Sequence, residues 1–234
     1  MTGTSTQGLD LFSTVDARHQ MGTVDEVIRF EDRVDLTAVR GTEASGVAPL
    51  WITVEALQLG ERNIASGART GLESPAPGAS ICILQGTSGQ AVLNSSTERW
   101  GRDTAGVLQM VMAANFVVFP DTAVGRGARW TMVQTMNQDG FSEVRTWSYE
   151  LVSIDESGYE LRGEVTSAWD EPLQTPQSLS GSDLVRTASG QFSAVGRFDQ
   201  PFPASGTFTG ASTNRSASMQ MDSTSTQTLV VTGH

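Results

Sequence analysis

The chain has 234 residues and a formal net charge of −11, because 26 acidic residues outnumber 15 basic residues that are all arginine. Such an acidic surface repels nucleic-acid backbones and anionic membranes, so the charge disfavours general nucleic-acid binding and docking to a membrane surface. Only 18% of the residues are charged, and Ser, Thr, Gly and Gln take their place, which is typical of β-rich extracytoplasmic proteins.

The chain starts with "MTGTSTQG", which has no apolar core of a signal peptide. We therefore predict that residues 1–10 are a flexible Ser/Thr-rich tether and that residues 11–232 form a single β-rich domain. We therefore expect either a cytosolic protein or an extracytoplasmic one whose targeting segment precedes this chain. No apolar run approaches the roughly 20 residues of a membrane helix, so no transmembrane segment is predicted.

Two-residue alternation of apolar and polar side chains predicts strands in the first 60 residues. Residues 11–21 show it weakly, residues 27–39 show it clearly, and residues 49–59 resume it after a turn. In the clear strand Asp32 interrupts an apolar row made of Ile28, Phe30, Val34, Leu36 and Ala38.

A loop rich in Gly, Pro and Ser is predicted over 63–79, followed by a hairpin over 80–96. The single cysteine, Cys82, lies in this hairpin, and we predict that it is a buried apolar side chain.

The stretch "DTAGVLQMVMAANF" departs from the strand pattern. Asp103 is a suitable N-cap, and Val107, Leu108 and Val111 recur at helical spacing, so a helix is predicted over about 103–116. Pro120 would end whatever element precedes it.

The second half of the chain returns to regular alternation. Strands are predicted over 129–136, 141–154 and 159–169, joined by the turns 137–140 and 155–158, and up to three more follow a polar loop at 170–183. Tight turns join antiparallel neighbours. The predicted fold class is therefore mainly β, a strongly curved antiparallel sheet or open barrel with one central helix.

The glycines of "FPDTAVGRGARW" (119–130) raise the question of a phosphate-binding loop. Such a loop follows a strand and opens a helix, whereas here the predicted helix comes first and a strand follows. We interpret Gly125 and Gly127 as backbone freedom at the entry to that strand, with Trp130 covering one end of the core.

This stretch also resembles the centre of a bacterial family of secreted or lipoprotein-type β domains of unknown function. The matching positions are Phe119, Pro120, Val124, Gly125, Gly127 and Trp130. The resemblance covers about residues 25–222, including "ICILQGTSGQAV" and Phe198–Asp199. It implies an extracytoplasmic β protein and brings no catalytic residues.

Residues for catalysis or metal binding are scarce. His19 and His234 are the only histidines, which disfavours a Ser-His-Asp triad, and with one cysteine they cannot build a zinc site. No cofactor is expected. A carboxylate pair would suffice for glycoside hydrolysis, but the strand acids fit a solvated face: Glu31, Asp35, Glu160 and Glu164.

The remaining candidate is an apolar interior that receives a lipid-like ligand. The residues predicted to line it are Met110, Met112, Phe116, Trp130, Met132, Trp147 and Tyr149. The competing interpretation is that the same side chains only pack as the core under the helix.

We therefore expect a non-catalytic extracytoplasmic protein of the cell envelope, in the periplasm, anchored to the outer membrane or secreted. Its partner would be an apolar small molecule, a lipid or an envelope protein. The first alternative is a structural subunit of a surface layer or filament, with oligomers formed through strand edges. The second alternative is a carboxylate-dependent hydrolase.

Overall fold

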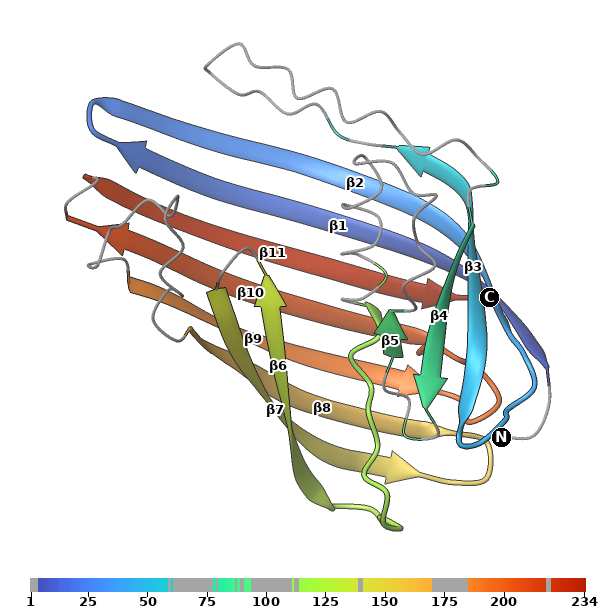
Figure 1. Cartoon of the computed structure of the whole chain (residues 1–234). Helices are drawn as coiled ribbons and strands as arrows, with labels where there is room; N and C mark the ends of the chain where they lie inside the picture. The colour runs from blue at the N-terminus through green and yellow to red at the C-terminus, as the bar shows by residue number, and fades with distance from the viewer. Residues whose placement is uncertain are drawn as a thin grey trace.

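The computed structural model describes residues 4–58, 60, 78, 80–86, 88, 91–93, 111, 114–138, 141–169, 185–217 and 220–234. Within these residues the protein is a single 11-stranded antiparallel sheet (Figure 1). The strand order is β5-β4-β3-β2-β1-β11-β10-β9-β8-β7-β6, and the sheet does not close, since β5 and β6 pair on one side only. The predicted fold class is thus confirmed as mainly β.

The strands follow the predicted chain order with small shifts at their ends. Their bounds are β1 Ser5–Met21, β2 Val24–Arg40, β3 Val47–Gln58, β4 Ser80–Gly86, β5 Ala91–Leu93, β6 Arg129–Gln138, β7 Phe141–Ile154, β8 Tyr159–Trp169, β9 Val185–Gly196, β10 Ser205–Ser216 and β11 Met221–Gly233. The loops predicted over 63–79 and 170–183 lie almost entirely outside the described residues.

The two ends of the chain meet in the middle of the sheet. β1 pairs with β11 in a register that runs from Leu9↔Gly233 to Met21↔Met221, so the strands of the two chain halves form one continuous sheet. β1 already begins at Ser5, inside the range predicted as a tether, and the side chain of Gln7 is buried there.

Burial alternates along the strands as the sequence pattern predicts. Val34, Leu36 and Ala38 of β2 are buried between exposed or half-buried neighbours, and Tyr149 and Leu151 of β7 behave in the same way. We call the side of the sheet that carries these residues the inner face and the opposite side the outer face. In Figure 1, both edges of the sheet turn toward the same side of the long strands β1, β2 and β11.

Most of the predicted helix lies outside the described residues, which here are Val111 and 114–116. Val111 and Ala114 are helical and buried, and the backbone N–H of Asn115 donates to the carbonyl oxygen of Val111 at 3.1 Å. In the described part of the chain, no helix has the length and apolarity needed to cross a bilayer.

The turn before β6 confirms the interpretation of Gly127 as backbone freedom at the entry to the strand. Gly127 has a φ of 80°, which glycine adopts without strain, and its N–H donates to the carbonyl oxygen of Leu151 at 2.7 Å. The N–H of Ala128 donates to the carbonyl oxygen of Gly125 at 3.0 Å. The turn therefore starts β6 rather than a helix.

Candidate functional site

The inner face carries a continuous cluster of aromatic rings, which we call the aromatic cluster. Trp130 and Tyr149 stack at 5.1 Å between ring centroids with an interplanar angle of 6°, and Trp147 lies 5.6 Å from Phe192. The members are Phe116, Phe119, Trp130, Trp147, Tyr149, Tyr159, Phe192, Phe198 and Phe208. Rings at such separations attract one another beyond the area they bury.

Glycines on neighbouring strands make room for these rings. A Cβ on Gly163 would collide with the ring of Phe192, and one on Gly196 would collide with the ring of Tyr159. Gly163 and Phe192 are also direct cross-strand partners. The rings therefore lie on bare backbone, which brings β7, β8 and β9 into dense packing on the inner face.

The register brings most of the predicted lining residues together. Trp130 stands opposite Tyr149, and Met132 stands opposite Trp147. Phe116, Trp147 and Tyr149 belong to the buried core, and Trp130 and Met132 pack against it while partly exposed. Met110 and Met112 lie outside the described residues.

Side-chain hydrogen bonds from the aromatic cluster hold the segment that leads to Pro120 against the inner face. The Tyr149 hydroxyl donates to the carbonyl oxygen of Phe116 at 3.0 Å, and Trp130 Nε1 donates to the carbonyl oxygen of Val118 at 2.9 Å. Burial raises the pKa of Tyr149 far above its usual value, because it disfavours the charged phenolate. The backbone of residues 116–118 therefore lies against the aromatic cluster.

Trp147 differs from Trp130 in its hydrogen bonding. Its side chain is buried, with 8% of the residue exposed, yet none of the described residues accepts a hydrogen bond from the indole Nε1–H. Trp130, in contrast, has its N–H bonded to Val118.

Further along the strands the inner face becomes polar. Arg145, two residues before Trp147 on β7, makes a bidentate ion pair with Glu143 at 2.7 and 3.1 Å. Ser223 and His19 Nδ1 share a hydrogen bond of 2.7 Å. We call this region the polar band. Asp32, the polar spot indicated by the break in its apolar row, is buried and lies opposite the buried Ser13, in the cross-strand row that continues through Leu229 to Phe208.

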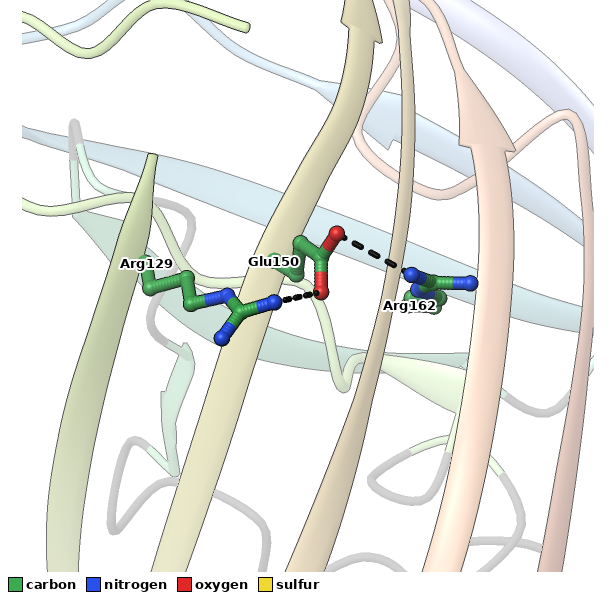
Figure 2. Close-up of polar contacts among 3 residues, drawn as sticks. All are labelled: Arg129, Glu150 and Arg162. Carbon is green, nitrogen blue, oxygen red and sulfur yellow. Dashed lines mark hydrogen bonds and ion pairs between the residues drawn. The ribbon is translucent and has the colours of Figure 1, made fainter. Parts of the chain in front are cut away.

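The outer face carries a charged ladder across three strands (Figure 2). Glu150 of β7 accepts from Arg129 of β6 and from Arg162 of β8, both at 3.0 Å. The hydrogen bond from Arg162 is the largest of the effects that hold the pKa of Glu150 below its usual range. Glu150 is thus a paired carboxylate at neutral pH, a poor proton donor for acid catalysis.

The other residues considered for catalysis or metal binding have positions that strand pairing and solvent exposure explain. His19 and Ser223 are direct cross-strand partners in the β1–β11 ladder, where side chains meet anyway. Glu31, Asp35, Glu160 and Glu164 are exposed, as predicted for a solvated face. Cys82 is half-buried rather than buried, and it stands opposite the exposed Trp51; partial burial raises the pKa of its thiol.

The part of the chain that the structure describes contains no group of three or more His, Cys, Asp or Glu residues placed to hold a metal ion.

Sequence reasoning missed the contribution of β9 and β10 to the cluster. The sequence pattern predicts strands after the loop at 170–183 but assigns none of their side chains, Phe192 and Phe208 among them, to the lining of the site. A signal was present in Gly190-x-Phe192 and Gly206-x-Phe208-x-Gly210, where a glycine and an aromatic residue share one face.

Comparisons with known proteins give little beyond this geometry. No protein-family model and no curated protein matches the chain. Among solved structures, it is similar to a DUF1329 family protein from Desulfovibrio piger, with 8% identity and a TM-score of 0.16 over 96% of this chain and 83% of that chain. It is also similar to OccK1 (OpdK) of Pseudomonas aeruginosa in two structures, one with vanillate, each with 5% identity and a TM-score of 0.18 over 98% of both chains. Likeness at these TM-scores carries no inference about function.

Proposed function

We propose that this chain is a non-catalytic protein of the bacterial cell envelope that binds an apolar or lipid-like small molecule on the inner face of its sheet. The observation that carries the proposal is the aromatic cluster, which lies on an unclosed, curled sheet. It stays partly exposed at Trp130 and Phe208, and the partly exposed Met132 packs beside it. An apolar surface that borders a polar band suits a ligand with a hydrocarbon part.

The compartment follows from composition rather than from geometry. The chain has few charged residues and is rich in Ser, Thr, Gly and Gln, a composition typical of β-rich extracytoplasmic proteins. The packing of rings on glycines shows that much of the cluster fills its own space. The ligand would therefore cover the partly exposed rings rather than enter a deep cavity.

Mass spectrometry of protein extracted under mild conditions tests this proposal. The expected result is a co-purified lipid-like molecule, and a fluorescent apolar dye should bind the stripped protein and be displaced by lipid extract. Protein that carries no such molecule and does not bind the dye would contradict it. Substitution of Met132 by Glu should weaken dye binding, while Val133→Glu, one position along β6 on the outer face, should leave it unchanged.

A second function, a self-assembling surface subunit, is favoured by the edge strand β6. In the described residues β6 pairs only with β7, it carries no acid, and Val133 is 63% exposed. An edge strand whose one charged residue, Arg129, lies at its first position can pair with another copy of the chain. Light scattering would then show polymers that grow with concentration and disappear in Val133→Lys, whereas a monomer at all concentrations would contradict assembly.

A further inference from the structure

A hollow of about 550 Å³, which we call the polar hollow, lies on the outer face beside the charged ladder. Ser148 of β7 stands opposite Glu164 of β8, and Glu164 stands opposite Gln191 of β9. Because Ser148 is short and exposed, the surface is hollowed between the longer side chains around it. The outer-face residues that line the polar hollow are Arg129, Ser148, Glu150, Arg162, Glu164 and Gln191.

One side of the polar hollow is rich in hydrogen-bond donors. Arg129 and Arg162 each donate one hydrogen bond of 3.0 Å to Glu150, from the strands on either side of it (Figure 2). A guanidinium group has five N–H donors, so both arginines keep donors for a further acceptor. Their side chains are 75% and 64% exposed, so a ligand in the hollow can reach them.

The other side of the polar hollow carries an accessible carboxylate. Glu164 is exposed and lies two residues beyond Arg162 on the same face of β8, which separates the two Cα atoms by about 6.8 Å. Among the residues that the structure describes, no cation forms an ion pair with Glu164, whereas Glu150 has two such partners. The carboxylate of Glu164 is therefore available to a cationic group in the hollow.

We propose that the polar hollow binds a small zwitterion, whose anionic group lies on Arg129 and Arg162 and whose ammonium group lies on Glu164. Such a ligand carries a carboxylate or phosphate and an ammonium group a few bonds apart. The polar hollow and the aromatic cluster lie on opposite faces of the sheet, so this inference is independent of the apolar ligand proposed for the inner face.

The charges of the polar hollow favour a zwitterion over a ligand with one charge. A simple anion would face the carboxylates of Glu150 and Glu164 and a chain with a net charge of −11. A simple cation would face the two guanidinium groups. A zwitterion is neutral as a whole, and each of its charged groups meets a side of the hollow with the opposite charge.

Titration of the full chain with 4-aminobutanoate, butanoate and butylammonium, at constant ionic strength and followed by ¹H–¹⁵N spectra, tests the inference. Glu164→Gln keeps the size of the side chain and removes its charge; Glu160→Gln, on the same face of β8 but outside the hollow, is the matched control. We expect 4-aminobutanoate to move amide resonances of β7 and β8 around the hollow. Glu164→Gln should weaken this binding about two- to fivefold, the effect of one exposed ion pair.

The other probes and the control show which part of the inference holds. Butanoate has no ammonium group, so Glu164→Gln should not weaken its binding. Equal affinity of Glu164→Gln and Glu160→Gln for 4-aminobutanoate would overturn the role of Glu164. Butanoate that binds the original protein as tightly as 4-aminobutanoate would overturn the zwitterion, and resonances that no probe moves would overturn the site itself.

A lipid head group is a second source of the same chemistry, because phosphatidylethanolamine carries a phosphate and an ammonium group a few bonds apart. Co-sedimentation of the full chain with phosphatidylcholine vesicles that contain phosphatidylethanolamine distinguishes the two sources. Co-sedimentation that is lost in Glu164→Gln and kept in Glu160→Gln would assign the hollow to a head group. Binding of 4-aminobutanoate without co-sedimentation would assign it to a free zwitterion.

Discussion

Replacing Gly163 with alanine should destabilise the sheet, because the added methyl group would push β8 away from β7 and displace the ring of Phe192. Gly163 lies on the inner face of β8, opposite Tyr149 of β7 and Phe192 of β9. An added Cβ would meet the backbone oxygen of Ser148 and the ring of Phe192, both too close for any carbon atom. The backbone oxygen cannot rotate away, so the strand itself must move.

The size of the effect follows from two opposing contributions. Overpacking in a dense core costs about 1–3 kcal/mol, and a collision with backbone belongs at the upper end. Alanine also restricts the unfolded chain, which returns about 0.4–1 kcal/mol. The expected net loss is about 2 kcal/mol in the free energy of unfolding, or about 4–8 °C in Tm for a chain of this size.

Thermal and urea unfolding of Gly163→Ala and Gly125→Ala, compared with the original protein, measure this loss. Gly125 is the control, because a Cβ there would meet nothing within 4 Å, so its change should stay within about 0.5 kcal/mol. Adding Phe192→Leu to Gly163→Ala should recover part of the loss, because a smaller side chain relieves one of the two collisions. A Gly163→Ala variant as stable as the original would refute the packing of Phe192 on Gly163.

Three further predictions concern buried polar groups and titration. Gln7 bonds the Phe202 N–H and the carbonyl oxygens of Phe202 and Pro203; Gln7→Leu should therefore cost at least about 2 kcal/mol in urea unfolding, and unchanged stability would contradict this clamp. Burial raises the pKa of both tyrosines, Tyr149 and Tyr159, so tyrosinate absorbance should stay absent through pH 10–11 while the fold persists. Because the folded state favours the neutral phenol, the free energy of unfolding should fall as pH rises above the unfolded pKa of these groups. Normal titration of both tyrosines in the folded protein would disprove their burial. Glu150 has a lowered pKa because of Arg162 and Arg129, so its contribution to the free energy of unfolding is present above its unfolded pKa of 4.5 and is lost as pH falls through the lower folded pKa. In thermal scans, the difference in Tm between Glu150→Gln and the original protein should therefore shrink below about pH 4.5. A difference independent of pH would argue against the charged ladder.

Local chemistry explains why several elements could be predicted in detail. β8 has the predicted bounds, 159–169, since the turn before it is specified by its own residues: Asp155 Oδ1 accepts from the backbone N–H groups of Ser157 and Gly158. The apolar side of β2 and β7 also follows from alternation alone, because successive side chains point to opposite faces.

The candidate site was predictable only in part. Trp130 and Met132 share a face with Tyr149 and Trp147 through a local hairpin, which the sequence pattern indicates. Phe192 and Phe208 come from strands far along the chain, and their place in the cluster depends on glycines in neighbouring strands. That no described residue accepts from the Trp147 indole N–H depends on the packing of the whole inner face, and no sequence pattern indicates it.

From the sequence by itself came the strands, their turns, the buried side of each strand and the entry of β6, because these depend on contacts between residues close along the chain. Only the tertiary structure decided that β1 pairs with β11, that the sheet curls without closing, and which rings meet on the inner face. Any strand offers the same backbone hydrogen bonds to a distant partner, so these bonds do not select which strands pair. The partners are selected by the burial of apolar side chains when the whole sheet assembles.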